Sequence, residues 1–168
     1  MRFSAIGLLL VTLLVSGCGF QLRGAVTLPE GVDSLYVGGQ DSNGDLAQKL
    51  RALLRGNNIE VVTSPGKASY SVILLESGSM RRTLALDSQA RAAEYLLTET
   101  ARFEVRDSSG ALALAAQDLQ EQRVMAYDPD NVTGKAEEES LLRQNMRDGL
   151  AAQIARRLRK LPAPAATL

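Results

Sequence analysis

The sequence has no histidine and only one cysteine, Cys18, among its 168 residues. Histidine is the most frequent general base and metal ligand in proteins, and the cysteine thiolate is the nucleophile of the thiol enzymes. The absence of histidine excludes histidine-dependent catalysis, and a lone cysteine that carries a lipid would leave no free thiol for thiol-dependent catalysis. Ser–Lys or paired-carboxylate catalysis stays open in principle, but no spacing in the sequence favours it. A single cysteine also excludes a disulfide within the chain, so stability must come from the hydrophobic core.

The chain also lacks a net charge and has few aromatic residues. It has 19 basic and 19 acidic residues, no tryptophan and only three phenylalanines. Removal of Arg2 with an N-terminal signal peptide would leave 18 basic against 19 acidic residues, a net charge of −1. Such a protein has no overall field that attracts nucleic acid or an anionic membrane, so an anionic ligand must be bound by a local patch. We therefore expect no nucleic-acid partner.

The N-terminus has the pattern of a bacterial lipoprotein signal peptide. Arg2 is followed by an apolar run over residues 5–15, which is shorter than the roughly 20 residues of a membrane-spanning helix but typical of a secretory signal. The next residues, Val-Ser-Gly-Cys, match the lipobox, in which the cysteine becomes the lipid-modified N-terminus. We expect residues 1–17 to be removed and Cys18 to carry the lipid. Gly19, where aspartate would favour inner-membrane retention, favours a lipid anchor on the periplasmic side of the outer membrane.

Hydrophobic periodicity predicts the secondary structure of the remaining chain. Short β-prone runs predict strands at 34–37 and 59–63, and these flank a helix whose leucines at 46, 50, 53 and 54 share one face. Alternation predicts strands at 70–80 and 94–106, and a last helix over 136–161 has a leucine-rich stripe, with three glutamates in its first turn. Residues 111–125 are ambiguous, because their composition favours helix while the preceding Asp-Ser-Ser-Gly turn favours a return strand. Strand is the preferred interpretation.

These elements predict a two-layer α+β sandwich, in which two helices pack on one face of a mostly antiparallel four-stranded sheet. Residues 18–161 would form this single domain, and residues 162–168 a disordered tail. The other face of the sheet carries polar residues and would face solvent or a partner.

Two segments contain candidate binding residues. The stretch 41–45, Asp-Ser-Asn-Gly-Asp, superficially resembles a calcium loop, but Leu46 and Ala52 occupy the positions where an EF-hand needs glycine and glutamate. Helix capping is the preferred interpretation. Arg81, Arg82 and Arg91 would gather near a hairpin tip beside Leu84 and Leu86, where guanidinium groups could bind phosphate and the leucines an acyl chain. The alternative for this tip is a solvated, mobile hairpin, and Lys135 is a weaker candidate of the same kind.

Several short motifs, taken in order, resemble the LptE family of lipopolysaccharide-assembly lipoproteins. They are Cys-Gly-Phe-Gln-Leu-Arg-Gly at 18–24, Leu-Pro at 28–29, Ala-Glu-Tyr at 93–95, Tyr-Asp-Pro at 127–129 and Arg-Lys-Leu-Pro at 159–162. The resemblance implies a non-enzymatic protein without a cofactor other than its covalent lipid. It further implies a partner, the outer-membrane β-barrel LptD, whose lumen the protein plugs and whose assembly it supports. Lipopolysaccharide binding is implied for cations of the tip and of the loop before the last helix, namely Lys135, Arg91, Arg81 and Arg82.

Two alternative functions belong to other classes. The protein could be an auxiliary lipoprotein of an ABC-type lipid transporter, which would copurify with an ATPase. It could also be a periplasmic hydrolase that uses serine and lysine or two carboxylates, for which the chain offers only four lysines, at 49, 67, 135 and 160.

Overall fold

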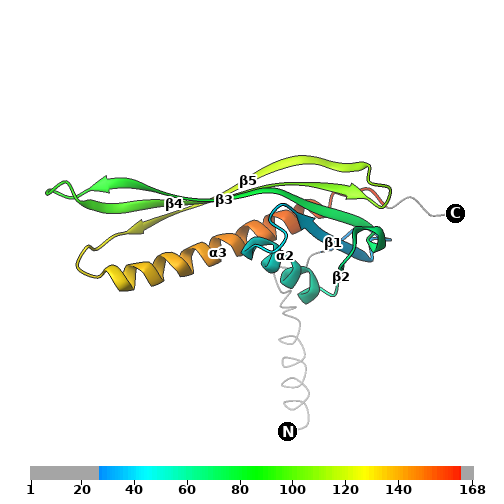
Figure 1. The fold of residues 1–168 in the computed structure, drawn as a ribbon, viewed down its shortest axis with the longest axis horizontal. Helices are drawn as coiled ribbons and strands as arrows, with labels where there is room; N and C mark the ends of the chain where they lie inside the picture. The colour runs from blue at the N-terminus through cyan, green and yellow to red at the C-terminus, as the bar shows by residue number, and fades with distance from the viewer. Residues whose placement is uncertain (1–26, 164–168) are drawn as a thin grey trace, which may run out of the picture.

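A computed structural model describes residues 27–163 (Figure 1). The expected signal peptide, the lipid site Cys18 and residues 164–168 of the expected tail lie outside the described residues. The elements are β1 (Ser34–Gly39), α2 (Asp45–Gly56), β2 (Glu60–Val62), the 3₁₀ helix η1 (Pro65–Lys67), β3 (Tyr70–Leu86), β4 (Ala92–Asp107), β5 (Leu112–Ala126) and α3 (Val132–Leu158). No helix within the described part of the chain is both long enough and apolar enough to cross a membrane.

The described elements form one sheet with both helices on the same side of it (Figure 1). The strand order is β2-β1-β3-β4-β5, in which β1 is parallel to both of its neighbours and the long strands β3, β4 and β5 are antiparallel. The predicted α+β architecture is confirmed, but the sheet has five strands, not the expected four. β2, which lies within the β-prone run predicted at 59–63, has only three residues and joins the sheet by pairing with β1 after the chain has crossed over through α2.

The ambiguous segment before the last helix is a strand. β5 pairs with β4 along most of its length. The turn that precedes it is held by Asp107, whose Oδ1 accepts hydrogen bonds from the amides of Ser109 and Ala111, while Gly110 adopts a φ of 85°. Cross-strand pairing along β4 therefore outweighs the helical propensity of alanine and glutamine.

The core lies between the sheet and the two helices. Alternate residues of β4, among them Phe103 and Val105, are fully buried against α2 and α3. Burial of a leucine or phenylalanine side chain contributes about 1.5–3 kcal/mol. A second, smaller cluster of Leu97, Met125 and Met146 lies where the long strands approach the middle of α3. Beyond this cluster the long strands run alongside the first turns of α3, and the β3–β4 turn projects past the start of the helix (Figure 1).

The last helix begins and ends earlier than the sequence predicts. α3 starts at Val132, where the side chain of Asn131 accepts a hydrogen bond from the amide of Gly134, and its first turn contains no acidic residue. The three glutamates at 137–139 consequently lie beyond the first turn, where the helix dipole contributes little. The helix ends at Leu158 rather than at Leu161. Because the helix starts earlier, these glutamates do not lie at its N-terminus. Two of them instead form ion pairs within the helix, Glu138 with Lys135 and Glu139 with Arg143.

Candidate functional site

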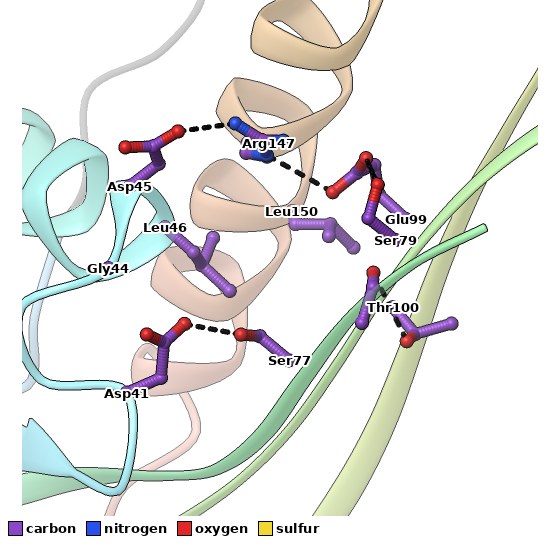
Figure 2. A pocket seen from close by; sticks show the side chains of 11 residues that line it. Asp41, Gly44, Asp45, Leu46, Ser77, Ser79, Glu99, Thr100, Arg147 and Leu150 are labelled. Atoms are coloured by element: carbon purple, nitrogen blue, oxygen red, sulfur yellow. Dashed lines mark hydrogen bonds and ion pairs between the residues drawn. The ribbon is translucent and has the colours of Figure 1, made fainter.

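A buried carboxylate, Glu99, interrupts the apolar face of β4 (Figure 2). Its Oε1 accepts hydrogen bonds from Ser79 Oγ at 2.6 Å and from Arg143 Nη1 at 2.8 Å, and its Oε2 accepts one from Arg147 Nε at 3.1 Å. Only 5% of the Glu99 side chain is exposed. A buried carboxylate is tolerated only when cations and hydrogen-bond donors compensate its lost hydration, and here the two arginines and the serine do so.

The two arginines extend this contact into a network of alternating charges. Arg147 also pairs with Asp45 at the start of α2. Arg143 also pairs with Glu139 at 2.7 Å, and Glu139 accepts a second ion pair from Arg81 of β3 at 2.8 Å. We call this chain the Glu99 network; its members are Asp45, Arg147, Glu99, Arg143, Glu139 and Arg81. It joins α2, α3 and the sheet.

The network keeps its acids ionised. Burial raises the pKa of Glu99, but the hydrogen bonds from Ser79, Arg143 and Arg147 outweigh it and hold the pKa below the usual range of glutamate. The pKa of Glu139 is lowered in the same way, since burial is outweighed by the hydrogen bonds from Arg143 and Arg81. Each carboxylate is thus a permanent anion near neutral pH, which suits it to an ion pair and not to proton transfer.

A polar cavity of about 230 Å³ lies beside Glu99, between the start of α2 and strands β3 and β4 (Figure 2). Its carboxylates already have partners, because Asp41 accepts a hydrogen bond from Ser77 and Asp45 from Arg147. The expected helix cap is wrong, since Gly44 occupies the N-cap of α2 and no side-chain hydrogen bond caps this end of the helix. Within residues 27–163 no group of acidic residues could hold a metal ion. The cavity therefore belongs to the packing contact between α2 and the sheet, and its carboxylates are not free to bind a ligand.

A second cavity, of about 480 Å³, lies between the ends of β3 and β5 and the first turns of α3. We call it the distal pocket; it is lined by Arg81, Met125, Tyr127, Val132, Lys135, Ala136, Glu139, Ser140 and Arg143. Three of its lining residues are cations and one is an anion. The apolar side chains among them contribute a hydrophobic wall, so the distal pocket combines positive charge with apolar surface.

The cations of the distal pocket are paired with carboxylates of α3. Arg81 binds Glu139 and lies over the ring of Tyr95, with 4.8 Å between its guanidinium carbon and the ring centre. Lys135 Nζ binds Glu138 Oε2 at 2.8 Å. Arg81 and Lys135 are therefore held in place, and an anionic ligand would have to compete with these carboxylates.

The structure brings together two of the four cations that the sequence singled out. Arg81 and Lys135 line the same pocket although 54 positions separate them in the chain. Arg82 is exposed on the opposite face of β3, since successive residues of a strand point to opposite faces. Arg91 pairs with Asp87 at 2.8 Å and holds the β3–β4 turn. The expectation that the three arginines gather at the tip is wrong, because β3 continues to Leu86 and the turn is confined to residues 87–91.

Sequence reasoning missed the Glu99 network. One signal was present, because Glu99 occupies an inward position between Leu97 and Ala101 in an otherwise apolar series. A second was the pair Arg143 and Arg147, which are four residues apart and therefore lie on one face of α3. A lone carboxylate on an apolar strand face, with two arginines spaced for one helix face, is the pattern that predicts such a network.

The family match and the similar proteins of known name all indicate the same family. The LptE family, described as lipopolysaccharide-assembly, matches residues 32–158. The LPS-assembly lipoprotein LptE of Photorhabdus laumondii is 29% identical over 150 residues, which cover 89% of this chain and 81% of that protein. The protein of the same name from Pectobacterium atrosepticum is 26% identical over 155 residues, covering 89% and 80%.

Solved structures of lipoproteins share the fold. The rare lipoprotein B of Shewanella oneidensis superposes with a TM-score of 0.65 at 26% identity, covering 74% of this chain and 92% of that one. A minor lipoprotein of Acinetobacter baumannii gives the same TM-score and identity, covering 81% and 97%. Because the family match extends from before β1 to the end of α3, it includes every element that builds the sheet, the Glu99 network and the distal pocket. The chain thus belongs to the LptE family, the lipopolysaccharide-assembly lipoproteins of the Gram-negative envelope, which are not enzymes.

Proposed function

We propose that this lipoprotein plugs the lumen of an LptD-like β-barrel in the outer membrane, supports the assembly of that barrel and binds lipopolysaccharide on its way to the outer leaflet. The observation that carries the proposal is the family match over residues 32–158. The surface supports it as well. Barrel lumens are polar, and the sheet face that the helices leave uncovered carries both signs of charge, including Arg102 and Asp118.

A lipid on Cys18 would hold the plug at the membrane. Burial of acyl chains contributes about 0.8 kcal/mol per methylene, and durable anchoring needs more than one chain. The diacylglyceryl group that a lipobox cysteine receives provides two chains. We propose that this group on Cys18 is the membrane anchor, on the periplasmic side of the outer membrane.

Purification from outer membranes in mild detergent tests the partner and the anchor together. We expect a tagged full-length protein to recover a large β-barrel protein in about equal molar amount. Mass spectrometry of the mature N-terminal peptide should find lipid on Cys18. Recovery without a barrel would contradict the plug, and recovery with an ATPase complex would instead indicate an ABC-type transporter. An unmodified Cys18 would contradict the anchor.

We propose the distal pocket as the lipopolysaccharide site. Lipopolysaccharide combines phosphate groups with acyl chains, and the distal pocket combines cations with apolar side chains such as Met125, Tyr127 and Val132. The Arg81 guanidinium offers paired donors that match a phosphate, whereas the Lys135 ammonium acts as a compact charge. Arg82 and Arg91 are secondary candidates, because they belong to the same end of the sheet but not to the pocket lining.

Reversal of one pocket charge should weaken lipopolysaccharide binding. We expect Lys135→Glu to lower the affinity about tenfold, which corresponds to about 1.4 kcal/mol, because it replaces an attractive contact with repulsion. Lys67→Glu is the matched control, since Lys67 is exposed in η1, at some distance along the chain from the pocket residues, and makes no ion pair among the described residues. Binding can be measured with fluorescent lipopolysaccharide and the full-length protein in detergent. Equal losses in the two variants would contradict the site.

A further inference from the structure

The distal pocket holds its own counter-ions. Two consecutive glutamates of α3 bind the two cations that come from separate parts of the pocket: Glu139 binds Arg81 at 2.8 Å, and Glu138 binds Lys135 at 2.8 Å. Glu137, next to them, makes no ion pair among the described residues. The two pairs are not equivalent in exposure, since 46% of the Glu138 side chain is exposed but only 16% of the Glu139 side chain.

Ligand binding in such a pocket is an exchange of anions. A phosphate that approaches Arg81 must displace Glu139, and one that approaches Lys135 must displace Glu138. Each displaced carboxylate remains stabilised, because Glu139 keeps its second partner, Arg143, at 2.7 Å, and Glu138 is already about half exposed to solvent. A ligand with two phosphate groups can replace both carboxylates and leave both Arg81 and Lys135 neutralised. A ligand with one phosphate group can replace only one of the two carboxylates and is repelled by the other carboxylate.

We propose that Glu138 and Glu139 are specificity-determining residues of the distal pocket, which occupy Lys135 and Arg81 in the absence of ligand and so select amphiphiles with two phosphates over those with one. This inference rests on the proposed function of the pocket as a lipopolysaccharide site. It adds that the two carboxylates weaken the binding of all anionic amphiphiles, and weaken the binding of amphiphiles with one phosphate most.

Two purified forms of lipid A, with two phosphates and with one, are the probes. The wild-type full-length protein in detergent should prefer the bisphosphorylated form about tenfold, the scale of one charge-assisted contact. Glu138→Gln and Glu139→Gln should each tighten binding of the monophosphorylated form about threefold, the scale of one partly exposed ion pair, and reduce the preference. Glu137→Gln is the matched control and should behave as the wild type. The effects should decrease as salt is raised.

The outcomes separate the inference from the proposed function. If Lys135→Glu weakens both probes but Glu138→Gln and Glu139→Gln behave as Glu137→Gln, the pocket binds lipid A and the selectivity proposal is wrong. If Lys135→Glu leaves both probes unaffected, the pocket is not the site and both proposals are wrong. Glu139→Gln also removes a partner of Arg143 and so affects α3. Glu138 pairs with Lys135 and with no other described residue, so Glu138→Gln is decisive if the two variants differ.

Discussion

Replacement of Glu99 by alanine is expected to lower the free energy of unfolding by about 3 kcal/mol at neutral pH. The reason is that Arg143, with only 14% of its side chain exposed, and Arg147 would each lose a buried carboxylate partner. Arg143 would keep Glu139 and Arg147 would keep Asp45, so the loss should fall at the lower end of the range for broken buried pairs. Chemical denaturation of the full-length protein in detergent measures the change.

Two further variants show whether the buried position causes this loss. Glu76→Ala removes a carboxylate from the opposite face of the same sheet, where Glu76 is exposed, and should change stability by less than about 0.5 kcal/mol. Glu99→Gln keeps the size of the side chain and should cost less than Glu99→Ala. Similar losses in Glu76→Ala and Glu99→Ala would show that the Glu99 network does not stabilise the joint between α3 and the sheet.

The same network makes stability depend on pH with a definite sign. The pKa of Glu99 is lower in the folded protein than in the unfolded chain, so the unfolded chain takes up a proton first as the pH falls. The stabilisation by Glu99 is therefore complete above the unfolded pKa and is lost as the pH falls through the folded one. Glu139 contributes with the same sign. We expect wild-type stability to decrease below about pH 5, and to decrease less steeply in Glu99→Gln.

Replacement of Gly39 by alanine is expected to cost about 3 kcal/mol, the upper end of the range for a strained backbone position. Gly39 has a φ of 115°, which side chains other than that of glycine rarely tolerate. A Cβ atom there would also collide with the carbonyl oxygen of Leu74, which accepts the hydrogen bond from the amide of Gln40. The close approach is part of the path from β1 to α2, so the collision would displace the loop that carries Asp41.

The loss in Gly39→Ala should appear as a decrease of roughly 10 °C in the melting temperature, followed by circular dichroism. Gly66→Ala is the matched control, because a Cβ at Gly66 would meet no atom within 4 Å and its φ is not positive. We expect the control to melt within about 2 °C of the wild type. Equal melting temperatures for the two variants would mean that the backbone at Gly39 adapts without strain.

Much of the architecture could be predicted from periodicity, because a buried face imposes its own repeat on the sequence. The alternation in β4 and the leucines of α2 each identified their element and its buried side. The boundaries of α3 and the number of strands were less accessible. An asparagine cap shifted the start of the helix to Val132. The strand β2 was predicted within 59–63, but it is too short for its place in the sheet to be evident from its own residues.

The candidate site depends on a detail of strand register. Between Leu74 and Glu76, β3 contains one extra residue relative to β4. Side chains alternate with a period of two, so one inserted residue reverses the face of every residue that follows it. The bulge therefore directs Ser79 and Arg81 toward α3 and directs Arg82 away from it. Without the bulge, Arg82 would face the helix instead.

The sequence by itself determined the lipobox, the absence of histidine, the α+β class and the resemblance to LptE, because each depends on local pattern or composition. Only the tertiary structure decided that Arg81 and Lys135 share a pocket, that Glu138 and Glu139 neutralise them, and that Glu99 joins α3 to the sheet. Most of these contacts join residues that lie far apart in the chain, whereas the pair of Lys135 and Glu138 depends on a helix that starts before Lys135. Register, bulges and helix ends determine such contacts, and all three result from packing.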